Sequence, residues 1–436
     1  MSETATQFVS WFRSTAPYIR VHRDKTFVIQ FDDELVYSEI FTDLVHDLAL
    51  LNSLGIHLVL VYGARHSIEA WLAENDQAST YHEGLRLTDT DTMELVKTAA
   101  GKLRVEIESK LSMGLGNTPM SNAELRVSSG NYVMARPVGI VEGIDYQFTG
   151  EIRSIDRDAI QSKLDRDEIV LIPPLGYSIT GEAFNLSAIN LATELSIELK
   201  ADKLIYLMEG ECLQDKDGNF ISQLVHSEVQ TLIEKGNIED SVYLRSGVHA
   251  CQGGVSRVQL IDRHTSGAIL QELFTRDGAG TMISATSYDV IRQASAYDIA
   301  GILDLLEPLE KQGVLVERSR EKLELEIEHY TLMERDNVII GCAALYPFAR
   351  DHAAELACFV IHPEYHNQGM GEQLFDLMEM TARNMGLKKI FVLTTQAEHW
   401  FLQRGFSECS LDDIPVEKQD LYNYQRKSRV MIRIIS

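Results

Sequence analysis

The sequence predicts an α/β protein built from two domains, and three observations support this prediction. Its 436 residues are too many for one domain with a single hydrophobic core, since domains average about 150 residues. From residue 25 to about 285, short β-branched strands alternate with amphipathic helices, a pattern typical of a largely parallel sheet. Around residues 284–290 the residues are mostly small and polar, and the pattern of strands and helices then restarts. We therefore expect a three-layer αβα domain over residues 1–285 and a smaller α/β domain over residues 290–436.

The first domain is expected to start with an amphipathic helix over residues 8–22, whose aromatic residues fit either a core or an oligomer contact. A second helix is expected over residues 39–55. The predicted strands are rich in Val, Ile and Leu, and they cover residues 26–31, 56–63, 168–176, 203–209 and 256–262. Alternation of this kind places helices on both faces of one sheet.

The second domain is expected to hold a mixed sheet. A strand and a helix are predicted within residues 290–313, and a charged helix is predicted over residues 319–333. Further strands are predicted over residues 337–345, 355–363 and 388–395, and a glycine-spaced loop with a helix follows the second of these.

Composition and charge exclude several classes of protein. The net charge of -25 argues against nucleic acid as a partner, because binding a polyanion needs a basic surface. No apolar run approaches the roughly 20 residues that span a bilayer, and residues 1–20 carry no export signal, so no membrane partner is expected. The cysteines are too scattered for a disulfide framework or a metal site, which predicts reduced thiols in the cytoplasm: Cys212, Cys251, Cys342, Cys358 and Cys409.

A Gly-x-Gly loop at residues 369–371 gives the first indication of function. Glycines let the backbone turn tightly and point N–H groups at an anion, where the dipole of the following helix favours negative charge. Taken alone, the loop fits a plain tight turn as well as a phosphate site. It follows the predicted strand "ELACFVIHP", and the element "WFLQRGF" comes later, over residues 400–406.

This order of motifs resembles the GNAT acyltransferase superfamily, whose signature Gln/Arg-x-x-Gly-x-Gly/Ala grips the pyrophosphate of acetyl-coenzyme A. The first position departs from the signature, because His366 replaces Gln or Arg. Together with "LQELFTRDGAGTMI" and "QDLYNYQRKS", the chain resembles bacterial N-acetylglutamate synthases along nearly its whole length. In that family an amino-acid-kinase-like domain is fused to a GNAT domain that makes N-acetyl-L-glutamate, the first step of arginine biosynthesis.

The resemblance implies a set of site residues. Glu355 would be the general base, and Thr394 would protonate the leaving thiolate, because the usual tyrosine position holds Phe401. Arg318, Arg426 and Ser428 would bind the carboxylates of L-glutamate. Acetyl-coenzyme A would lie against Cys358, Phe359, Val360, His366, Asn367, Gln368, Gly369, Gly371 and Glu372. Residue chemistry alone also fits Glu355 as a solvent-facing residue and Arg318 as an exposed charge.

The family also implies feedback inhibition by L-arginine through the first domain. Tyr18, Glu272, Gly278 and Gly280 would bind this effector, although Glu272 also fits a solvated glutamate and Gly278 a helix C-cap. Amino-acid kinases carry a Lys-x-Gly-Gly loop after the first strand, whereas this chain has Asp32 and Asp33, which would repel ATP. The domain is therefore predicted to be a sensor without kinase activity, in a chain that forms homo-oligomers.

Two alternatives remain. The chain could be an N-acetylglutamate kinase with an appended regulatory domain, which the altered first-strand loop disfavours. It could also be a non-catalytic arginine sensor that acts through a partner, which the unusual His366 permits.

Overall fold

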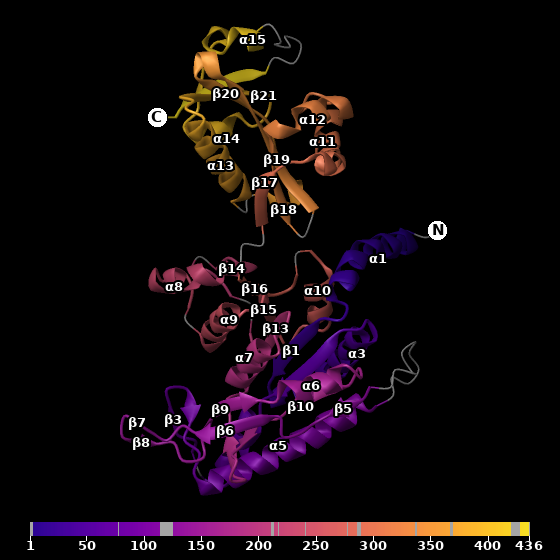
Figure 1. The fold of residues 1–436 in the computed structure, drawn as a ribbon, viewed down its shortest axis with the longest axis vertical. Helices are drawn as coiled ribbons and strands as arrows, with labels where there is room; N and C mark the ends of the chain where they lie inside the picture. The colour runs from indigo at the N-terminus through magenta and orange to yellow at the C-terminus, as the bar shows by residue number, and fades with distance from the viewer. Residues whose placement is uncertain are drawn as a thin grey trace. The chain divides into compact units, whose positions relative to one another are not determined.

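The structure is a computed structural model, and it describes residues 3–76, 78–113, 125–210, 213–216, 218–239, 241–276, 278–285, 289–335, 338–366, 369–419 and 428–435. The chain forms two compact units, Met1–Thr286 and Ser287–Ser436 (Figure 1). None of the described helices combines the length and apolar character needed to cross a membrane.

The first unit is built on an eight-stranded sheet in the order β14-β16-β15-β13-β1-β2-β10-β5. All neighbouring strands of this sheet are parallel except β15 and β16. Its strands are β1 (Thr26–Phe31), β2 (His57–Tyr62), β5 (Val127–Ser128), β10 (Ile169–Ile172), β13 (Lys203–Met208), β14 (Gln223–Val225), β15 (Arg257–Asp262) and β16 (Thr281–Ser284).

Helices cover both faces of this sheet, because most strand residues are apolar and buried, and alternate residues point to opposite sides. Phe27, Ile29 and Phe31 pack with one group of helices, and Val28 faces the other. The first group is α1 (Glu3–His22), α2 (Asp33–Val36), α3 (Ile40–Ser53), α4 (Arg65–Glu74), α5 (Thr90–Leu111) and α10 (Ala268–Phe274). The second group is α6 (Arg157–Leu164), α7 (Ala188–Glu198), α8 (His226–Glu234) and α9 (Val242–Gln252).

Smaller sheets complete the first unit. A four-stranded sheet has the order β12-β11-β6-β9, and two hairpins pair β3 with β4 and β7 with β8. Their bounds are β3 (Tyr81–His82), β4 (Leu85–Arg86), β6 (Val133–Pro137), β7 (Ile140–Val141), β8 (Ile144–Asp145), β9 (Gly150–Ile155), β11 (Leu175–Tyr177) and β12 (Ala183–Asn185). The predicted αβα arrangement is confirmed.

The second unit holds a seven-stranded mixed sheet in the order β17-β18-β19-β20-β21-β23-β22. Only β20 and β21 are parallel to each other. The strands are β17 (Asp289–Gln293), β18 (Tyr330–Arg335), β19 (Val338–Phe348), β20 (Ala353–Ile361), β21 (Lys389–Thr394), β22 (Ser407–Glu408) and β23 (Arg429–Ile434).

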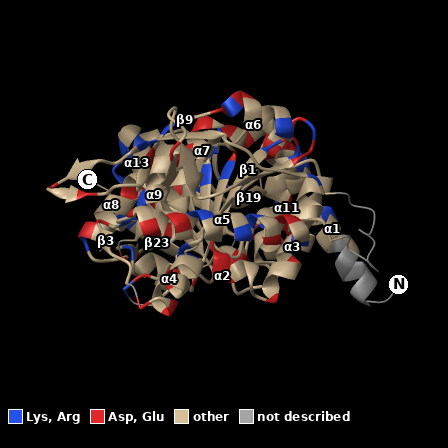
Figure 2. Cartoon of the chain, turned by 90° about the horizontal axis from the view of Figure 1, so that it is seen from below, with Lys and Arg blue, Asp and Glu red and all other residues tan. Residues whose placement is uncertain are grey.

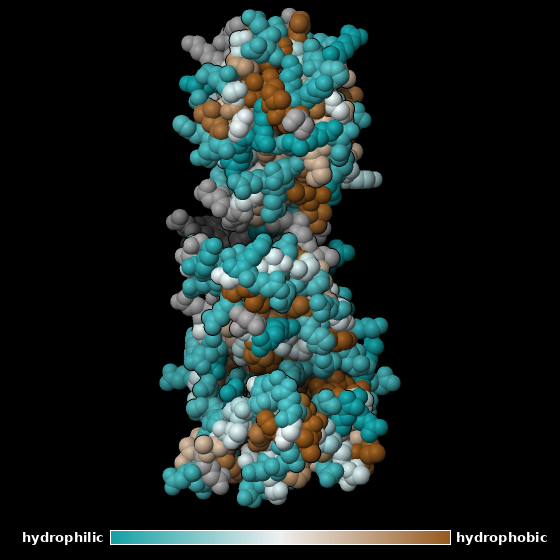
Figure 3. All heavy atoms as spheres, turned by 90° about the vertical axis from the view of Figure 1, so that its left-hand side faces the viewer, coloured by the Kyte–Doolittle hydropathy of each residue, from teal (hydrophilic) through white to brown (hydrophobic). Residues whose placement is uncertain are grey.

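Two pairs of helices flank this sheet. The helices α11 (Ile299–Lys311) and α12 (Arg320–Glu326) pack on one face, and α13 (Met370–Asn384) with α14 (Glu398–Leu402) pack on the other (Figure 1). A last short helix, α15 (Val416–Gln419), precedes β23. On the face seen in Figure 3, hydrophobic residues form separate small groups among hydrophilic ones.

One predicted element is wrong in part. The charged helix expected over residues 319–333 ends at Glu326, and after a 3-10 turn the chain continues as β18. Tyr330, Leu332 and Met333 are fully buried there, between β17 and β19. Burial of β-branched and aromatic residues within a sheet has overridden the helical charge pattern.

Candidate active site

A split between two parallel strands forms the centre of the candidate site. The register of β20 and β21 runs from Ala353 opposite Lys389 to Glu355 opposite Phe391, and then stops. Both strands continue beyond this point, to Ile361 and Thr394. Main-chain groups of β20 past Glu355 therefore have no β21 partner, and they can pair instead with an extended ligand.

A β-bulge on β20 turns additional side chains toward the face covered by α11 and α12. The register with β19 shifts between the pairs Cys342–Val360 and Ala344–Ala357, and Cys358 has a positive φ of 47°. One extra residue in a strand reverses which side chains face each side. Cys358 consequently lies in the core cluster under α11 and α12, on the same side as Glu355.

Glu355 is a buried acid and not the solvent-facing residue that was considered as an alternative. It is only 6% exposed, and its register partner on β19 is Tyr346. Its Oε2 lies 2.8 Å from Nζ of Lys418, on α15. A carboxylate removed from water needs such a partner to remain charged. Lys418 is not among the site residues predicted from the sequence, because no local motif marks it.

A network of hydroxyl groups and charges surrounds Cys358. Tyr330 Oη lies 3.3 Å from Cys358 Sγ, and Tyr346 Oη donates to Glu326 Oε2 at 2.7 Å. Arg318 Nη1 donates to a main-chain carbonyl, while its Nε is buried and has no hydrogen-bond partner among the described residues. A buried guanidinium donor with no acceptor suits a ligand carboxylate. Arg318 is therefore not the freely exposed charge of the alternative interpretation.

The Cys358 thiol is poorly suited to act as a nucleophile. Burial raises its pKa, against the opposing effects of Arg318 and of a hydrogen bond from Tyr330. Burial also holds the pKa of the neighbouring Cys342 thiol well above its usual range. Because the thiolate is the reactive form, covalent catalysis through Cys358 is disfavoured.

The start of α13 forms the expected anion-binding end. Gly369 has a φ of 78°, which a residue with a side chain rarely adopts, and as the N-cap residue it has no side chain with which to cap the helix. The first N–H groups of such a helix have no partner within it. A Cβ on Gly371 would lie 3.3 Å from the Trp400 ring, so glycine also allows close packing here.

The neighbouring side chains hold this loop in place. His366 Nε2 donates to the carbonyl of Ile361 at 2.9 Å, which ties the loop to the end of β20. Glu372 forms an ion pair with Arg404, whose guanidinium stacks 3.8 Å from the centre of the Trp400 ring. Two of the predicted cofactor residues, Asn367 and Gln368, lie outside the described residues.

Thr394 ends β21, three residues after Phe391, the partner of Glu355. Its Oγ1 accepts a hydrogen bond of 3.0 Å from the N–H of Ala397, which leaves the hydroxyl hydrogen to be donated elsewhere. Phe401 is buried among the aromatic rings of Phe359 and Trp400, and it carries no proton to donate.

The predicted substrate residues near the C-terminus are only partly described. Ser428 is 9% exposed and lies directly before β23. Arg426 lies outside the described residues. The structure therefore brings Glu355, Cys358 and Arg318 to one face of the split sheet.

The predicted effector residues of the first unit form a connected group. Glu272 Oε2 accepts hydrogen bonds from the N–H groups of Ala279 and Gly280, at 2.7 and 2.8 Å. Gly278 has a φ of 68°, so it supplies the turn within the loop rather than a cap on α10, which ends at Phe274. A Cβ on Gly280 would collide with the carbonyl oxygen of Leu260.

The N-terminal helix reaches the same place. His22 Nε2 donates to the carbonyl of Leu273 on α10 at 2.8 Å, and its ring contacts Phe274 at 5.8 Å between centroids. Tyr18, one turn earlier, packs on the same core and lies 6.5 Å from His22 by ring centroids. The contacts join α1 and α10, the helices that carry Tyr18 and Glu272.

In the first unit, a carboxylate occupies the N-terminus of α4. Asp33 is fully buried, and its two oxygens accept from the N–H groups of His66 and Ser67 at 3.2 and 2.6 Å, at the N-terminus of α4. Burial, and then the charge of Asp33, raises the pKa of Asp32. Figure 2 shows acidic residues at α2. The anion site at this helix is filled by the chain itself.

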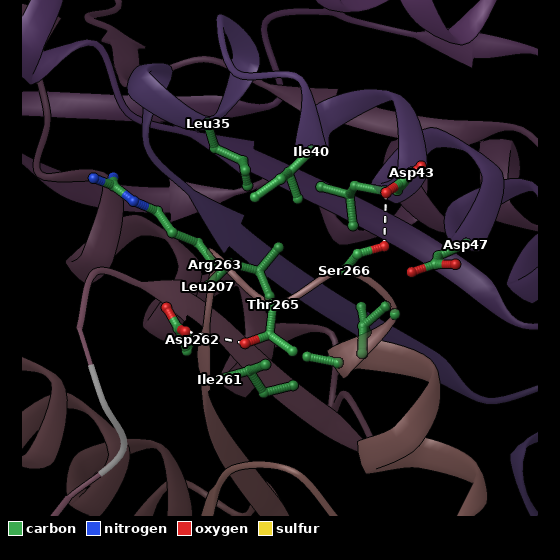
Figure 4. A pocket seen from close by; sticks show the side chains of 14 residues that line it. Leu35, Ile40, Asp43, Asp47, Leu207, Ile261, Asp262, Arg263, Thr265 and Ser266 are labelled. Carbon is green, nitrogen blue, oxygen red and sulfur yellow. Dashed lines mark hydrogen bonds between the residues drawn. The ribbon is translucent and has the colours of Figure 1, made fainter.

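A small pocket lies beside α2 and α3, at the carboxyl ends of β13 and β15 (Figure 4). Asp43 accepts from Ser266 Oγ at 2.6 Å, and Asp262 accepts from Thr265 Oγ1 at 3.1 Å. Burial and the nearby Asp43 raise the pKa of Asp47 to about 7. The acidic lining disfavours a nucleotide phosphate in this pocket.

Arg263, which lines the same pocket, is already engaged with acids. It forms ion pairs with Glu34 and, at 2.8 Å, with Glu209. Its charge is therefore largely compensated within the protein.

A unit with the amino-acid-kinase fold joined to a GNAT acetyltransferase unit is the class of protein that this fold and site define. Residues 25–262 match the model of the amino acid kinase family, and residues 299–406 match that of the acetyltransferase (GNAT) family. An amino-acid acetyltransferase of Yersinia pseudotuberculosis is 47% identical over 438 residues, covering 99% of both chains. The chain belongs to the amino-acid acetyltransferase family, which confirms the resemblance and the fold class inferred from the sequence.

Two solved structures are similar to the whole chain. The crystal structure of N-acetylglutamate synthase from Neisseria gonorrhoeae complexed with coenzyme A and L-arginine is 36% identical, with a TM-score of 0.85. A structure of N-acetylglutamate synthase from the same organism complexed with coenzyme A and N-acetyl-glutamate is also 36% identical, with a TM-score of 0.63. Each covers 98% of this chain and is itself covered over 99% of its length.

Proposed function

We propose that this protein transfers the acetyl group of acetyl-coenzyme A to the α-amine of L-glutamate, giving N-acetyl-L-glutamate and coenzyme A, and that L-arginine inhibits it. The observation that carries the proposal is the split between β20 and β21, with buried Glu355 at its start and the N-terminus of α13, which begins after Gly369, near its end. The related N-acetylglutamate synthase structures hold coenzyme A together with L-arginine or N-acetyl-glutamate.

The described residues fit acetyl-coenzyme A. Main-chain groups of Cys358, Phe359 and Val360 lie past the last pair with β21 and can bind the extended part of the cofactor. The N–H groups at the start of α13, beside Gly369 and Gly371, suit its pyrophosphate. Because these contacts come from the main chain, they do not depend on Gln or Arg at position 366.

Acetyl transfer forms a C–N bond and breaks the C–S bond of the thioester, while the glutamate nitrogen loses two protons and the departing sulfur gains one. Glu355 takes the first proton from the glutamate ammonium, directly or through a water molecule, so that the amine can attack. Thr394 donates its hydroxyl hydrogen to the departing sulfur, since its oxygen already accepts from Ala397. The second proton of the nitrogen, lost after the attack, replaces that hydroxyl hydrogen, so that one proton is released overall, from Glu355. Arg318, with Arg426 and Ser428, binds the two carboxylates of glutamate.

The first unit is proposed to sense arginine without transferring phosphate. Asp33 occupies the N-terminus of α4, and the nearby pocket is acidic, so neither place is prepared for ATP. The guanidinium of arginine would instead meet Glu272, and the loop at Gly278 and Gly280 would face its main-chain groups.

We further propose that the protein is cytoplasmic and that it forms homo-oligomers. The four described cysteines are free, and two aromatic residues of α1, Trp11 and Phe12, are about half exposed. Size-exclusion chromatography with light scattering tests the assembly, and a monomer at micromolar concentration would contradict it.

The deciding experiment measures coenzyme A release with L-glutamate and ADP release with N-acetylglutamate and ATP, each with and without arginine. We expect coenzyme A release only, reduced by arginine. The Glu355→Gln variant should lose roughly 10²–10⁴-fold in turnover, the usual contribution of a general base. ADP release would favour a kinase, and the absence of both products would favour a non-catalytic sensor.

A further inference from the structure

A single lysine contacts the proposed base from a distant part of the chain. Lys418 Nζ lies 2.8 Å from Glu355 Oε2, and the two side chains are 22% and 8% exposed. In the part of the chain that the structure describes, no other cation forms an ion pair with Glu355.

The turn that carries Lys418 is anchored against the same strands. Ile414 is buried with residues of β20, β21 and β23. The N–H of Lys418 donates to the carbonyl of Pro415 at 2.8 Å, and Gln419 Nε2 donates to the carbonyl of Ile414 at 2.7 Å. These bonds fix where the lysine side chain starts, so its approach to Glu355 is built into the fold.

The other titratable groups facing Glu355 do not supply its counter-charge. Tyr346 lies opposite it on β19, and Cys358 follows it on β20. Burial raises the pKa of both groups, so both are neutral near pH 7. Glu326, which accepts a hydrogen bond from Tyr346, carries the same sign as Glu355. Arg318 is positively charged and lies on the same face, but among the described residues it forms no ion pair with Glu355. Lys418 therefore provides the positive charge in direct contact with this carboxylate.

We propose that Lys418 is a positioning residue for acetyl transfer, which keeps Glu355 ionised and oriented before glutamate binds. The inference rests on the proposed role of Glu355 as the base. A buried carboxylate without a partner tends to take up a proton, and a protonated acid cannot accept one from the substrate ammonium. The lysine offsets this burial cost without touching the reacting atoms.

The test uses the full-length protein with Lys418→Met, which removes the charge and keeps an unbranched chain, and Lys418→Arg, which keeps the charge. Lys311→Met is the matched control, because it removes an exposed pair with Glu307 on α11 of the same unit. For each protein the measurements are kcat, KM for both substrates, and the pH dependence of kcat.

We expect Lys418→Met to move the acid limb of the kcat profile to higher pH. On that limb its kcat should fall roughly tenfold, the change that one pKa unit produces, and the loss should shrink as the pH rises. KM for acetyl-coenzyme A should stay within about twofold in Lys418→Met. Lys418→Arg should return the acid limb of the kcat profile to its position in the unmodified protein. Lys311→Met should match the unmodified protein.

If the ion pair between Lys418 and Glu355 has only a structural role, the kcat measurements give a different result. If Lys418→Met lowers kcat equally at every pH, or leaves it unchanged, the inference is overturned. If that variant does not fold, the Glu355→Gln/Lys418→Met double variant removes both charges. Turnover equal to that of Glu355→Gln alone supports coupling through the carboxylate, and a further loss refutes it. An unmodified protein that does not acetylate glutamate, or full activity in Glu355→Gln, would instead refute the proposed function.

Discussion

Replacement of Glu272 should move arginine inhibition to higher arginine concentrations. This carboxylate lies on α10, and its Oε2 holds the N–H groups of Ala279 and Gly280 at 2.7 and 2.8 Å. With both of these bonds on one oxygen, Oε1 is the atom that can accept from a guanidinium. A charge-assisted hydrogen bond is worth about 1.5–3 kcal/mol, which corresponds to roughly ten- to a hundredfold in affinity.

Two substitutions separate the loop-holding role of Glu272 from its proposed contact with the effector. Glu272→Gln keeps an oxygen that can accept from the loop and removes only the charge, so a shift of about tenfold is expected. Glu272→Ala also releases the loop, so its shift should approach a hundredfold, with a lower melting temperature. Glu228→Ala is the control, because it removes an exposed acid from α8 on the opposite face of the sheet.

The assay follows coenzyme A release against arginine concentration at fixed substrate concentrations, and each rate is divided by the uninhibited rate of the same variant. Thermal unfolding with and without arginine provides a second readout. Because coupling between sites is reciprocal, arginine inhibits by favouring a state that binds substrate or the transition state less well. Unaltered arginine sensitivity in both Glu272 variants would show that the effector binds elsewhere.

Three further predictions concern stability and cofactor binding. Asp33→Asn should lower the melting temperature, since a charge at the start of α4 is worth about 1–2 kcal/mol, and an equal or higher value would contradict this role. Asp47→Asn should raise the melting temperature at pH 8 and change it much less at pH 4. Because folding raises the pKa of Asp47 from 3.8 to about 7, this carboxyl group costs stability progressively as the pH rises between those two values, so the same effect at both pH values would refute the argument. Gly371→Val should raise KM for acetyl-coenzyme A by about tenfold, because the side chain crowds Trp400, and an unchanged KM would exclude that packing.

The fold could be predicted largely from the sequence because its patterns are local. In residues 26–31 and 203–208 most side chains are apolar, which is typical of a parallel strand buried on both faces, and the structure places them as β1 and β13. The helix prediction was wrong at residues 330–333, because charges with helical spacing directly precede a strand there. Only the neighbouring strands β17 and β19 decide that this segment is extended.

The sequence predicts those parts of the candidate site in which the local backbone conformation demands a particular residue type. Gly369 needs a positive φ, and a glycine-spaced loop can be recognised from the chain alone. Lys418 and Tyr346 differ, because Lys418 reaches Glu355 only through the packing of α15 near the sheet, and Tyr346 only through the pairing of β19 with β20. A lone lysine in a short polar segment carries no signal that distinguishes it from a surface residue.

The bulge at Cys358 explains why even the strand itself could not be read fully from the sequence. A regular alternation along β20 would place Glu355 and Ala357 on one face, and Cys358 and Val360 on the other. In the structure, Cys358 and Val360 join the core cluster under α11 and α12, because the register shifts by one residue. The shift places Cys358 beside the acid, and it lies just beyond the point where β21 leaves β20. Since the bulge adds one residue to β20, its removal would turn the side chains of Cys358 and Val360 to the opposite face of the sheet, which α13 and α14 cover.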